Sequence, residues 1–248
     1  MPRMNLRHAL RPHIERLGER FRLKIVPHHV WLNINLDAYD HDLLTNILGP
    51  VRVVVDVGAN EVQTVSEIRT SFPDAQIYAF EPGAEALQLL KQNWGGDPKV
   101  SIVEAAATSH DGTAKFIDDP DRTVFSRIAV DPAAVTREVQ CTTLDTWCST
   151  NAVPKIDLLK IDTEGHDLEV IEGAAGLLAQ GAISAFVLEY GGHRDLIPLD
   201  QEVISMHTHG YQLAFTFAPW VVRSALHHGN ALFIRADLAP NLRMPDRS

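Results

Sequence analysis

The chain has 248 residues, of which 45% are hydrophobic and 22% charged, and its formal net charge is −10 at pH 7. These ordinary globular proportions exclude a mostly disordered chain, a collagen and a disulfide-stapled miniprotein. With 32 acidic against 22 basic side chains, broad nucleic-acid binding is not expected, because it needs cations at the phosphates. No apolar run reaches about 18 residues, so no transmembrane segment is expected.

The cysteine count bears on the compartment. Cys141 and Cys148 are too few for a disulfide framework or for a zinc site of their own. The N-terminus contains arginines but no apolar stretch of the kind found in secretory signals. Together these features predict a cytoplasmic protein with reduced thiols.

The first predicted elements form an N-terminal helical extension, residues 1–50, in which apolar residues recur at helical spacing. From residue 51 onward, short β-branched strands alternate with helices. This alternation predicts βαβ units and a parallel sheet. The expected strands cover residues 51–57, 75–80 and 100–106, and the expected helices cover 40–48, 62–72 and 84–94.

The alternation breaks over residues 107–144, where β-rich pieces are separated by Asp-Gly and Asp-Pro turns. We interpret this stretch as an antiparallel insertion. After it, we expect strands at 156–161, 183–189, 211–217 and 231–235, with helices at 164–179 and 200–209. The prediction is one α/β domain over residues 51–237, followed by a loose tail, 238–248.

Ligands of parallel α/β sheets bind beyond the carboxyl ends of the strands, so the residues that close each strand are the informative ones. Most of these ends carry a carboxylate, and carboxylates gathered at one edge of a sheet predict a functional site. The strand ends are Asp56-Val-Gly-Ala-Asn60, Phe80-Glu-Pro82, Glu104-Ala-Ala106, Lys160-Ile-Asp-Thr-Glu-Gly165 and Leu188-Glu-Tyr-Gly-Gly192.

The first of these turns, Gly58-Ala59-Asn60, lacks the second and third glycines of the dinucleotide fingerprint. Glu61, which follows it, would repel a pyrophosphate. A cationic ligand without phosphate, such as S-adenosylmethionine, fits this turn better. Glu81 can accept hydrogen bonds from ribose hydroxyls, although it could also stabilise the start of the helix after Pro82.

Four segments carry a resemblance to a known family. They are Val-Val-Asp-Val-Gly-Ala-Asn at 54–60, Tyr-Ala-Phe-Glu-Pro at 78–82, Thr-Thr-Leu-Asp at 142–145 and Leu-Leu-Lys-Ile-Asp-Thr-Glu-Gly-His-Asp at 158–167. With these segments the chain resembles FkbM-type, S-adenosylmethionine-dependent methyltransferases. The resemblance implies a Rossmann-like class I methyltransferase fold, with a mostly parallel seven-stranded sheet and helices on both faces. It also implies methylation of hydroxyl groups on sugars or secondary metabolites.

The strand ends and the resemblance together predict the cofactor site. The expected S-adenosylmethionine-binding residues are Asp56, Gly58, Ala59, Asn60, Glu81, Pro82, Glu104, Ala105, Ala106 and Asp162. The family usually has glycine where Val62 stands. This difference predicts either a narrower cofactor loop or a side chain that points into the core.

Methyl transfer to an alcohol needs an oxygen held in line with the methyl group and a base for the hydroxyl proton. The resemblance implies that Asp162 lies beside the transferable methyl. Glu164 is a second candidate, with helix-start stabilisation as its alternative role. His166 and His193 are imidazole bases suited to neutral pH, and Glu189 is the carboxylate alternative. Lys160 is expected to neutralise a neighbouring acid.

Other chemistries stay open. Asp162, Glu164 and Glu189 could hold a divalent cation, but no spacing requires one, so no metal is expected. Two alternative function classes are a non-catalytic S-adenosylmethionine-binding protein and a nicotinamide-dependent oxidoreductase, against which the missing glycines argue. The expected partner is a small molecule or a glycan with a hydroxyl group, and no nucleic acid. The sequence is also compatible with a homodimer.

Overall fold

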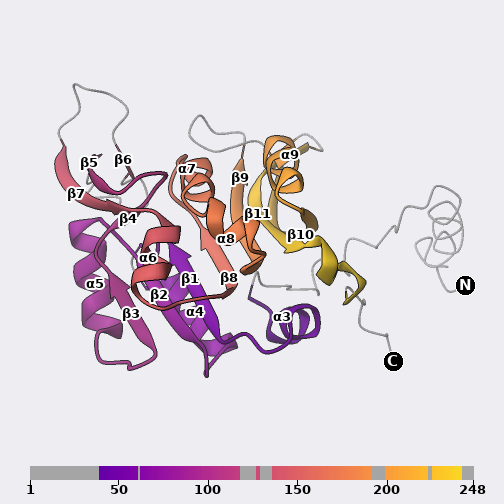
Figure 1. Cartoon of the computed structure of the whole chain (residues 1–248), viewed down its shortest axis with the longest axis horizontal. Helices are drawn as coiled ribbons and strands as arrows, with labels where there is room; N and C mark the ends of the chain where they lie inside the picture. Colours follow the sequence, from indigo (N-terminus) through magenta and orange to yellow (C-terminus); the bar gives the residue numbers. More distant parts are fainter. Residues whose placement is uncertain are drawn as a thin grey trace, which may run out of the picture. The chain divides into compact units, whose positions relative to one another are not determined.

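The structure is a computed structural model that describes residues 39–60, 62–117, 127–128, 136–191, 199–222 and 225–241. In these residues the main sheet has seven strands in the order β10-β11-β9-β8-β1-β2-β3 (Figure 1). The strands are β1 Val53–Val57, β2 Gln76–Phe80, β3 Val100–Val103, β8 Ile156–Ile161, β9 Ile183–Gly191, β10 Tyr211–Val222 and β11 Ala225–Arg235. Strand β11 runs antiparallel to both of its neighbours, and the other neighbouring pairs are parallel. This arrangement confirms the mostly parallel seven-stranded α/β sheet.

Helices follow the strands, as the alternation predicts. They are α3 His41–Leu48, α4 Gln63–Ser71, α5 Ala84–Trp94, α6 Leu144–Thr150, α7 Asp167–Glu172, α8 Ala175–Ala179, α9 Leu199–Thr208 and the 3-10 helix η2 Ala236–Asn241. All six residues of β8 are buried, which requires cover on both faces of the sheet. Figure 1 shows helices on both sides of it.

Strand alternation sorts the central residues onto two faces. Val55 and Val57 of β1 belong to the hydrophobic core formed with α6, α7, α8 and α9. Because successive side chains point to opposite faces, Asp56 lies on the other face. Asp56 pairs in register with Lys160 of β8, so the two side chains are neighbours on that face.

The predicted helix over residues 164–179 is wrong in its start and in its continuity. It begins only at Asp167, because Glu164 and Gly165 form a turn with φ angles of 53° and 101°. It also breaks at Gly173, whose backbone packs so closely on the loop at Thr108 that a Cβ would lie 2.0 Å from the Thr108 carbonyl oxygen. Helix α8 then restarts two residues later.

The insertion is a second sheet of four strands among the described residues, in the order β4-β7-β5-β6. Its strands are β4 Ala106–Ala107, β5 Gly112–Ile117, β6 Arg127–Ile128 and β7 Arg137–Thr142. Strand β5 is antiparallel to β6 and β7, whereas β4 is parallel to β7. The strand expected over 100–106 therefore ends at Val103, and the chain crosses into the second sheet.

The ends of the chain differ in part from expectation. Residues 1–38, 192–198 and 242–248 lie outside the described residues, and with them most of the predicted N-terminal extension. Helix η2 occupies the start of the stretch expected to be a loose tail, and Asn241 Nδ2 donates a hydrogen bond to the Ile47 carbonyl oxygen at 3.1 Å. In the part of the chain that the structure describes, no helix has the length and apolar character needed to cross a membrane.

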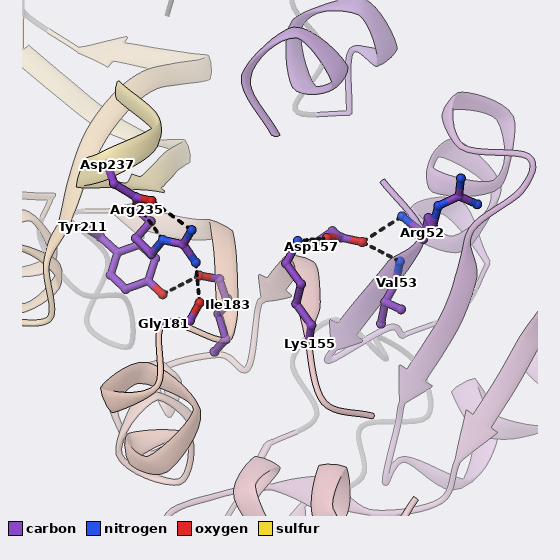
Figure 2. A network of polar contacts seen from close by, with 9 residues as sticks. All are labelled: Arg52, Val53, Lys155, Asp157, Gly181, Ile183, Tyr211, Arg235 and Asp237. Atoms are coloured by element: carbon purple, nitrogen blue, oxygen red, sulfur yellow. Dashed lines mark hydrogen bonds and ion pairs between the residues drawn. The ribbon is translucent and has the colours of Figure 1, made fainter. Parts of the chain in front are cut away.

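Polar contacts join the strands at their amino-terminal edge (Figure 2). Asp157 Oδ2 accepts hydrogen bonds from the backbone nitrogens of Arg52 and Val53 at 2.9 and 3.0 Å. The Tyr211 hydroxyl donates a hydrogen bond to the Ile183 carbonyl oxygen at 2.6 Å. Arg235 donates to the Gly181 carbonyl oxygen and pairs with Asp237. These contacts stabilise the edge of the sheet opposite the functional site.

Candidate active site

A cavity lies at the carboxyl ends of β1, β2 and β8. The insertion forms part of the wall as well. The lining residues are Val57, Gly58, Asn60, Phe80, Glu81, Pro82, Ala105, Ala106, Ala107, Phe116, Ile128, Asp162, Thr163, Glu164 and His166.

The turn after β1 packs directly on the end of β8. Gly58 has a φ of 76°, and a Cβ there would lie 1.8 Å from the Asp162 carbonyl oxygen, so only glycine fits. Beside it, Asn60 turns its backbone N–H toward Glu81. The side-chain Oδ1 of Asn60 is buried and has no hydrogen-bond partner among the described residues. An acceptor atom is therefore available at the cavity wall.

Glu81 is fixed at the wall by two backbone groups. Its Oε1 accepts a hydrogen bond from Gly83 N at 2.6 Å, and its Oε2 accepts one from Asn60 N at 2.8 Å. Burial of the side chain raises the pKa of Glu81 to about 7. Each carboxylate oxygen can accept more than one hydrogen bond, so Glu81 can still receive hydroxyl donors from a ligand.

Lys160 lies behind the cavity, between two aspartates. Its Nζ is 3.3 Å from Asp56 Oδ1 and 3.2 Å from Asp162 Oδ2, and it donates a hydrogen bond to the Gly58 carbonyl oxygen at 2.9 Å. Burial lowers the pKa of Lys160, but the charges of Asp162 and Asp56 outweigh it and the net direction is upward. The expectation that Lys160 neutralises a neighbouring acid is thus confirmed by its contacts.

Three carboxylates gather at the mouth of β8. One oxygen from each of Asp162, Glu164 and Glu189 lies within 4.8 Å of the others. Burial, followed by the charge of Asp162, raises the pKa of Glu189 to about 9. Oxygen ligands at this spacing could hold a hard cation, but acidic groups often gather without one, and the absence of a metal stays a prediction.

His166 contacts the insertion. It is the N-cap residue of α7 rather than part of its first turn. Its Nε2 is 3.2 Å from the Ile128 carbonyl oxygen, and its Nδ1 is 3.6 Å from Glu169 Oε1. Both ring nitrogens therefore face acceptor oxygens, and the ring links β6 to α7. His193, the other imidazole candidate, lies outside the described residues.

Some expected cofactor residues do not line the cavity. Asp56 is fully buried behind it, and Ala59 is only 1% exposed. Glu104 points to solvent, where it pairs with Lys91 at 2.8 Å. Val62 is the half-buried N-cap residue of α4 and is also absent from the cavity wall.

Several lining residues were not predicted from the sequence, namely Val57, Phe80, Ala107, Phe116, Ile128 and Thr163. Thr163 lies between two predicted residues and could have been included on that ground. Phe116 and Ile128 could not, because alternation marks the inward face of the insertion but not the direction in which its sheet folds. Arg137 was missed too: it donates to the Pro82 carbonyl oxygen, and its guanidinium lies 5.6 Å from the Phe116 ring centroid.

Comparison with known proteins agrees with the resemblance in the sequence. Residues 56–213 match the methyltransferase FkbM domain. The 2-O-methyltransferase NoeI of Sinorhizobium fredii (strain NBRC 101917 / NGR234) is 25% identical over 147 residues. The alignment covers 53% of this chain and 60% of NoeI, so the chain spans about three-fifths of that relative's length.

Solved methyltransferase structures are similar at low identity. One is the 1,6-didemethyltoxoflavin-N1-methyltransferase of Burkholderia thailandensis with bound S-adenosylhomocysteine, at 13% identity and a TM-score of 0.45 over 96% of this chain and 92% of that one. Another is the magnesium protoporphyrin IX methyltransferase of Synechocystis PCC 6803 with bound S-adenosylmethionine, at 11% identity and a TM-score of 0.42 over 81% and 82%.

The family match spans more than half of the chain and includes both turns that line the cavity, after β1 and after β8. It favours a methyltransferase over a nicotinamide-dependent oxidoreductase. S-adenosylmethionine is the methyl donor that this family implies. The chain belongs to the FkbM family of S-adenosylmethionine-dependent methyltransferases.

Proposed function

We propose that this enzyme methylates a hydroxyl oxygen of a sugar or a related small molecule in the cavity at the ends of β1, β2 and β8. The observation that carries the proposal is the group of three carboxylates at the mouth of β8 (Asp162, Glu164 and Glu189). Carboxylate oxygens accept hydrogen bonds from hydroxyl groups and repel anionic acceptors. The name of the distant relative NoeI, a 2-O-methyltransferase, supports oxygen as the atom methylated.

The residues of the cavity fit S-adenosylmethionine. We propose that Glu81 receives the ribose hydroxyls and that Asn60 Oδ1, which has no partner among the described residues, accepts from the ammonium group. Gly58 keeps the wall free of a side chain where the turn meets Asp162. A carboxylate-rich cavity also suits a ligand with a positive sulfonium.

When bound, S-adenosylmethionine supplies a methyl carbon on a positively charged sulfur, which leaves as a neutral thioether when an oxygen lone pair bonds to that carbon. The residues of the chain must hold the acceptor oxygen in line and take its proton. We assign the hydrogen bond from the acceptor hydroxyl to the Asp162 carboxylate, which Lys160 holds at 3.2 Å. The Asp162 carboxylate then takes the hydroxyl proton.

His166 is the alternative proton acceptor. Its ring lines the cavity, but both of its nitrogens already face oxygens of Ile128 and Glu169. A base role would need the ring to release one of these contacts. Asp162 is therefore our first choice, and His193 keeps its place as a candidate from the sequence alone.

A panel of sugars and hydroxylated metabolites tests the proposal, with radiolabelled methyl transfer as the measurement. Asp162→Asn is expected to lower kcat by about 10²–10⁴, the usual range for general acid–base roles. The matched control is Asp157→Asn, which changes a carboxylate at the opposite end of the same strand. Methylation confined to nitrogen or carbon acceptors, or an Asp162→Asn variant as fast as the parent, would contradict the proposal.

The domain bounds, the compartment and the oligomeric state also remain proposals. We place the methyltransferase domain at residues 51–237 and the protein in the cytoplasm, where its buried free thiols, Cys141 and Cys148, would stay reduced. A homodimer is left to be decided by measuring the molar mass in solution.

A further inference from the structure

We propose that Lys160 is a positioning residue that ties the cofactor turn after β1 to the Asp162 carboxylate at the end of β8. Lys160 would thereby set the spacing between the part of the site that binds the cofactor and the part that reacts. The proposal rests on the cofactor site proposed above, and it gives Lys160 a role beyond neutralising a charge.

The number of N–H donors on Lys160 matches the number of oxygens around its Nζ. A lysine ammonium has three N–H donors. Three oxygens surround Lys160 Nζ: the Gly58 carbonyl oxygen at 2.9 Å, Asp162 Oδ2 at 3.2 Å and Asp56 Oδ1 at 3.3 Å. The side chain is only 5% exposed, so water cannot readily replace any of these partners.

The two aspartates beside Lys160 differ in their exposure to solvent. Asp56 is wholly buried, and its Oδ1 lies 3.3 Å from the Lys160 ammonium nitrogen. It therefore anchors the ammonium from behind. Asp162, in contrast, has a side chain that is 34% exposed and lines the cavity. Asp56 therefore contacts the ammonium on its buried side, and the ammonium contacts Gly58 and Asp162 on the side of the active site.

The Gly58 carbonyl and the Asp162 carboxylate, which Lys160 contacts, belong to two different segments of the site. Gly58 lies in the turn after β1, and Asp162 follows the end of β8. A Cβ on Gly58 would clash with the Asp162 carbonyl oxygen, so the two segments already touch through their backbones. Lys160 adds a link from the Gly58 carbonyl to the Asp162 side chain, which fixes the direction of that carboxylate relative to the turn.

A purely charge-balancing lysine makes a different prediction. If Lys160 only compensated Asp56, removing both charges together would leave a well-packed protein with an unchanged cofactor site. If Lys160 positions Gly58 and Asp162, the same double change weakens cofactor binding although no buried charge is left unpaired. The decisive variant is therefore Asp56→Asn with Lys160→Met.

The measurement is the affinity for S-adenosylmethionine and for S-adenosylhomocysteine by titration calorimetry, which needs no acceptor. The double variant is expected to bind both about tenfold more weakly or worse, the loss typical of a charged hydrogen bond. Both ligands should weaken alike, because a positioning effect does not depend on the sulfonium charge. The matched control is Lys155→Met with Asp157→Asn, an ion pair of 2.7 Å at the other end of β8 (Figure 2), which should leave both affinities unchanged.

A second measurement uses the unaltered protein, in case the double variant does not fold. The buried Nζ of Lys160 should give a slowly exchanging ammonium signal in nitrogen NMR, and this signal should shift when either ligand saturates the site. The Lys155 signal should not shift, because Lys155 precedes the start of β8, at the opposite end from the cavity.

The outcomes separate the two proposals. A parent protein that binds neither ligand contradicts the proposed cofactor site itself. A parent that binds both, together with a double variant of equal affinity, overturns only the role of Lys160. An unshifted Lys160 signal at saturation overturns it as well.

Discussion

Glu81 shows how one side chain can serve the fold and the site together. Its two oxygens accept backbone hydrogen bonds from Gly83 and Asn60 and still face the cavity. Glu81→Gln keeps the size of the side chain but removes its charge and one acceptor oxygen. We expect the affinity for S-adenosylmethionine to fall by about 1.5–3 kcal/mol in titration calorimetry, the range for hydrogen bonds to charged groups.

The control for this prediction is Glu104→Gln. Both glutamates follow strands of the same sheet, but the side chain of Glu104 is 65% exposed and pairs with Lys91 outside the cavity. The control should bind the cofactor as the parent does. Equal affinities for all three proteins would remove Glu81 from the cofactor site.

At the scale of elements, helix α8 depends on a residue from another helix. Its own N-cap residue, Ala174, provides no side-chain hydrogen bond. Asp145 of α6 instead accepts hydrogen bonds from the backbone nitrogens of Gly176 and Leu177 at 2.6 and 2.9 Å. Asp145→Ala should lower the free energy of unfolding in urea by about 1–2 kcal/mol, as the loss of a helix cap does.

Asp145→Asn is the matched variant, because the amide keeps one acceptor oxygen. It should lose less stability than Asp145→Ala, and neither change should alter cofactor affinity, since Asp145 does not line the cavity. If Asp145→Ala unfolded at the same urea concentration as the parent, the cap would have no energetic role.

The insertion is held to the main sheet by Arg137. This side chain donates to the Pro82 carbonyl oxygen and lies over the ring of Phe116, and both contacted residues line the cavity. Arg137→Met should speed amide hydrogen exchange in β5 and β7 and weaken cofactor binding about tenfold. Lys115→Met, at an exposed position of β5, should change neither. Parent-like exchange in Arg137→Met would show that other contacts hold the insertion.

For the whole molecule, carboxyl groups whose pKa is raised, mainly by burial, make stability depend on pH. Burial raises the pKa of Asp167 to about 6, of Glu81 to about 7, and of Glu189 and Glu202 to about 9. In the unfolded chain these groups ionise near 3.8 to 4.5. The folded protein therefore binds more protons than the unfolded chain between these limits, so its stability falls as pH rises from about 4.5 to about 9.

Glu202 offers the sharpest test of this behaviour. It is 1% exposed, and its carboxylate oxygens have no hydrogen bond among the described residues. Glu202→Gln should raise the free energy of unfolding at pH 8 by at least about 1.4 kcal/mol, the value of one pKa unit, and should have less effect at pH 5. Thermal unfolding at both pH values measures this. A gain that is equal at the two pH values would contradict a raised pKa.

The sequence predicts the sheet well because its signals are local. The β-branched run at 51–57 and the run Ile-Asp-Leu-Leu-Lys-Ile at 156–161 correspond to the central strands β1 and β8. The helix expected over 164–179 fails at its start, where Glu164 and Gly165 have positive φ, and near Gly173, which packs against Thr108, a residue distant in the sequence. Local pattern cannot show such a contact.

The residues of the candidate site likewise fall into those that local sequence predicts and those that it does not. Gly58, Glu81 and Asp162 could be placed because they follow strands, and the edge of a parallel sheet brings strand ends together. The exclusion of Glu104 from the cavity depends on its rotation toward Lys91. The contribution of Phe116 depends on how the second sheet folds over the strand ends. Both features depend on tertiary packing, which a local sequence pattern cannot show.

The entry and exit of the insertion lie side by side, since Ala106 and Ala107 of β4 pair with Cys141 and Thr142 of β7. A stretch whose two ends are neighbours can be replaced by another of different length without stretching the chain around it. The replaceable stretch includes Phe116, on the wall that faces the strand ends. New acceptor preferences could thus arise by recombination of one contiguous gene segment, while the strand ends that carry Gly58, Glu81 and Asp162 are inherited unaltered.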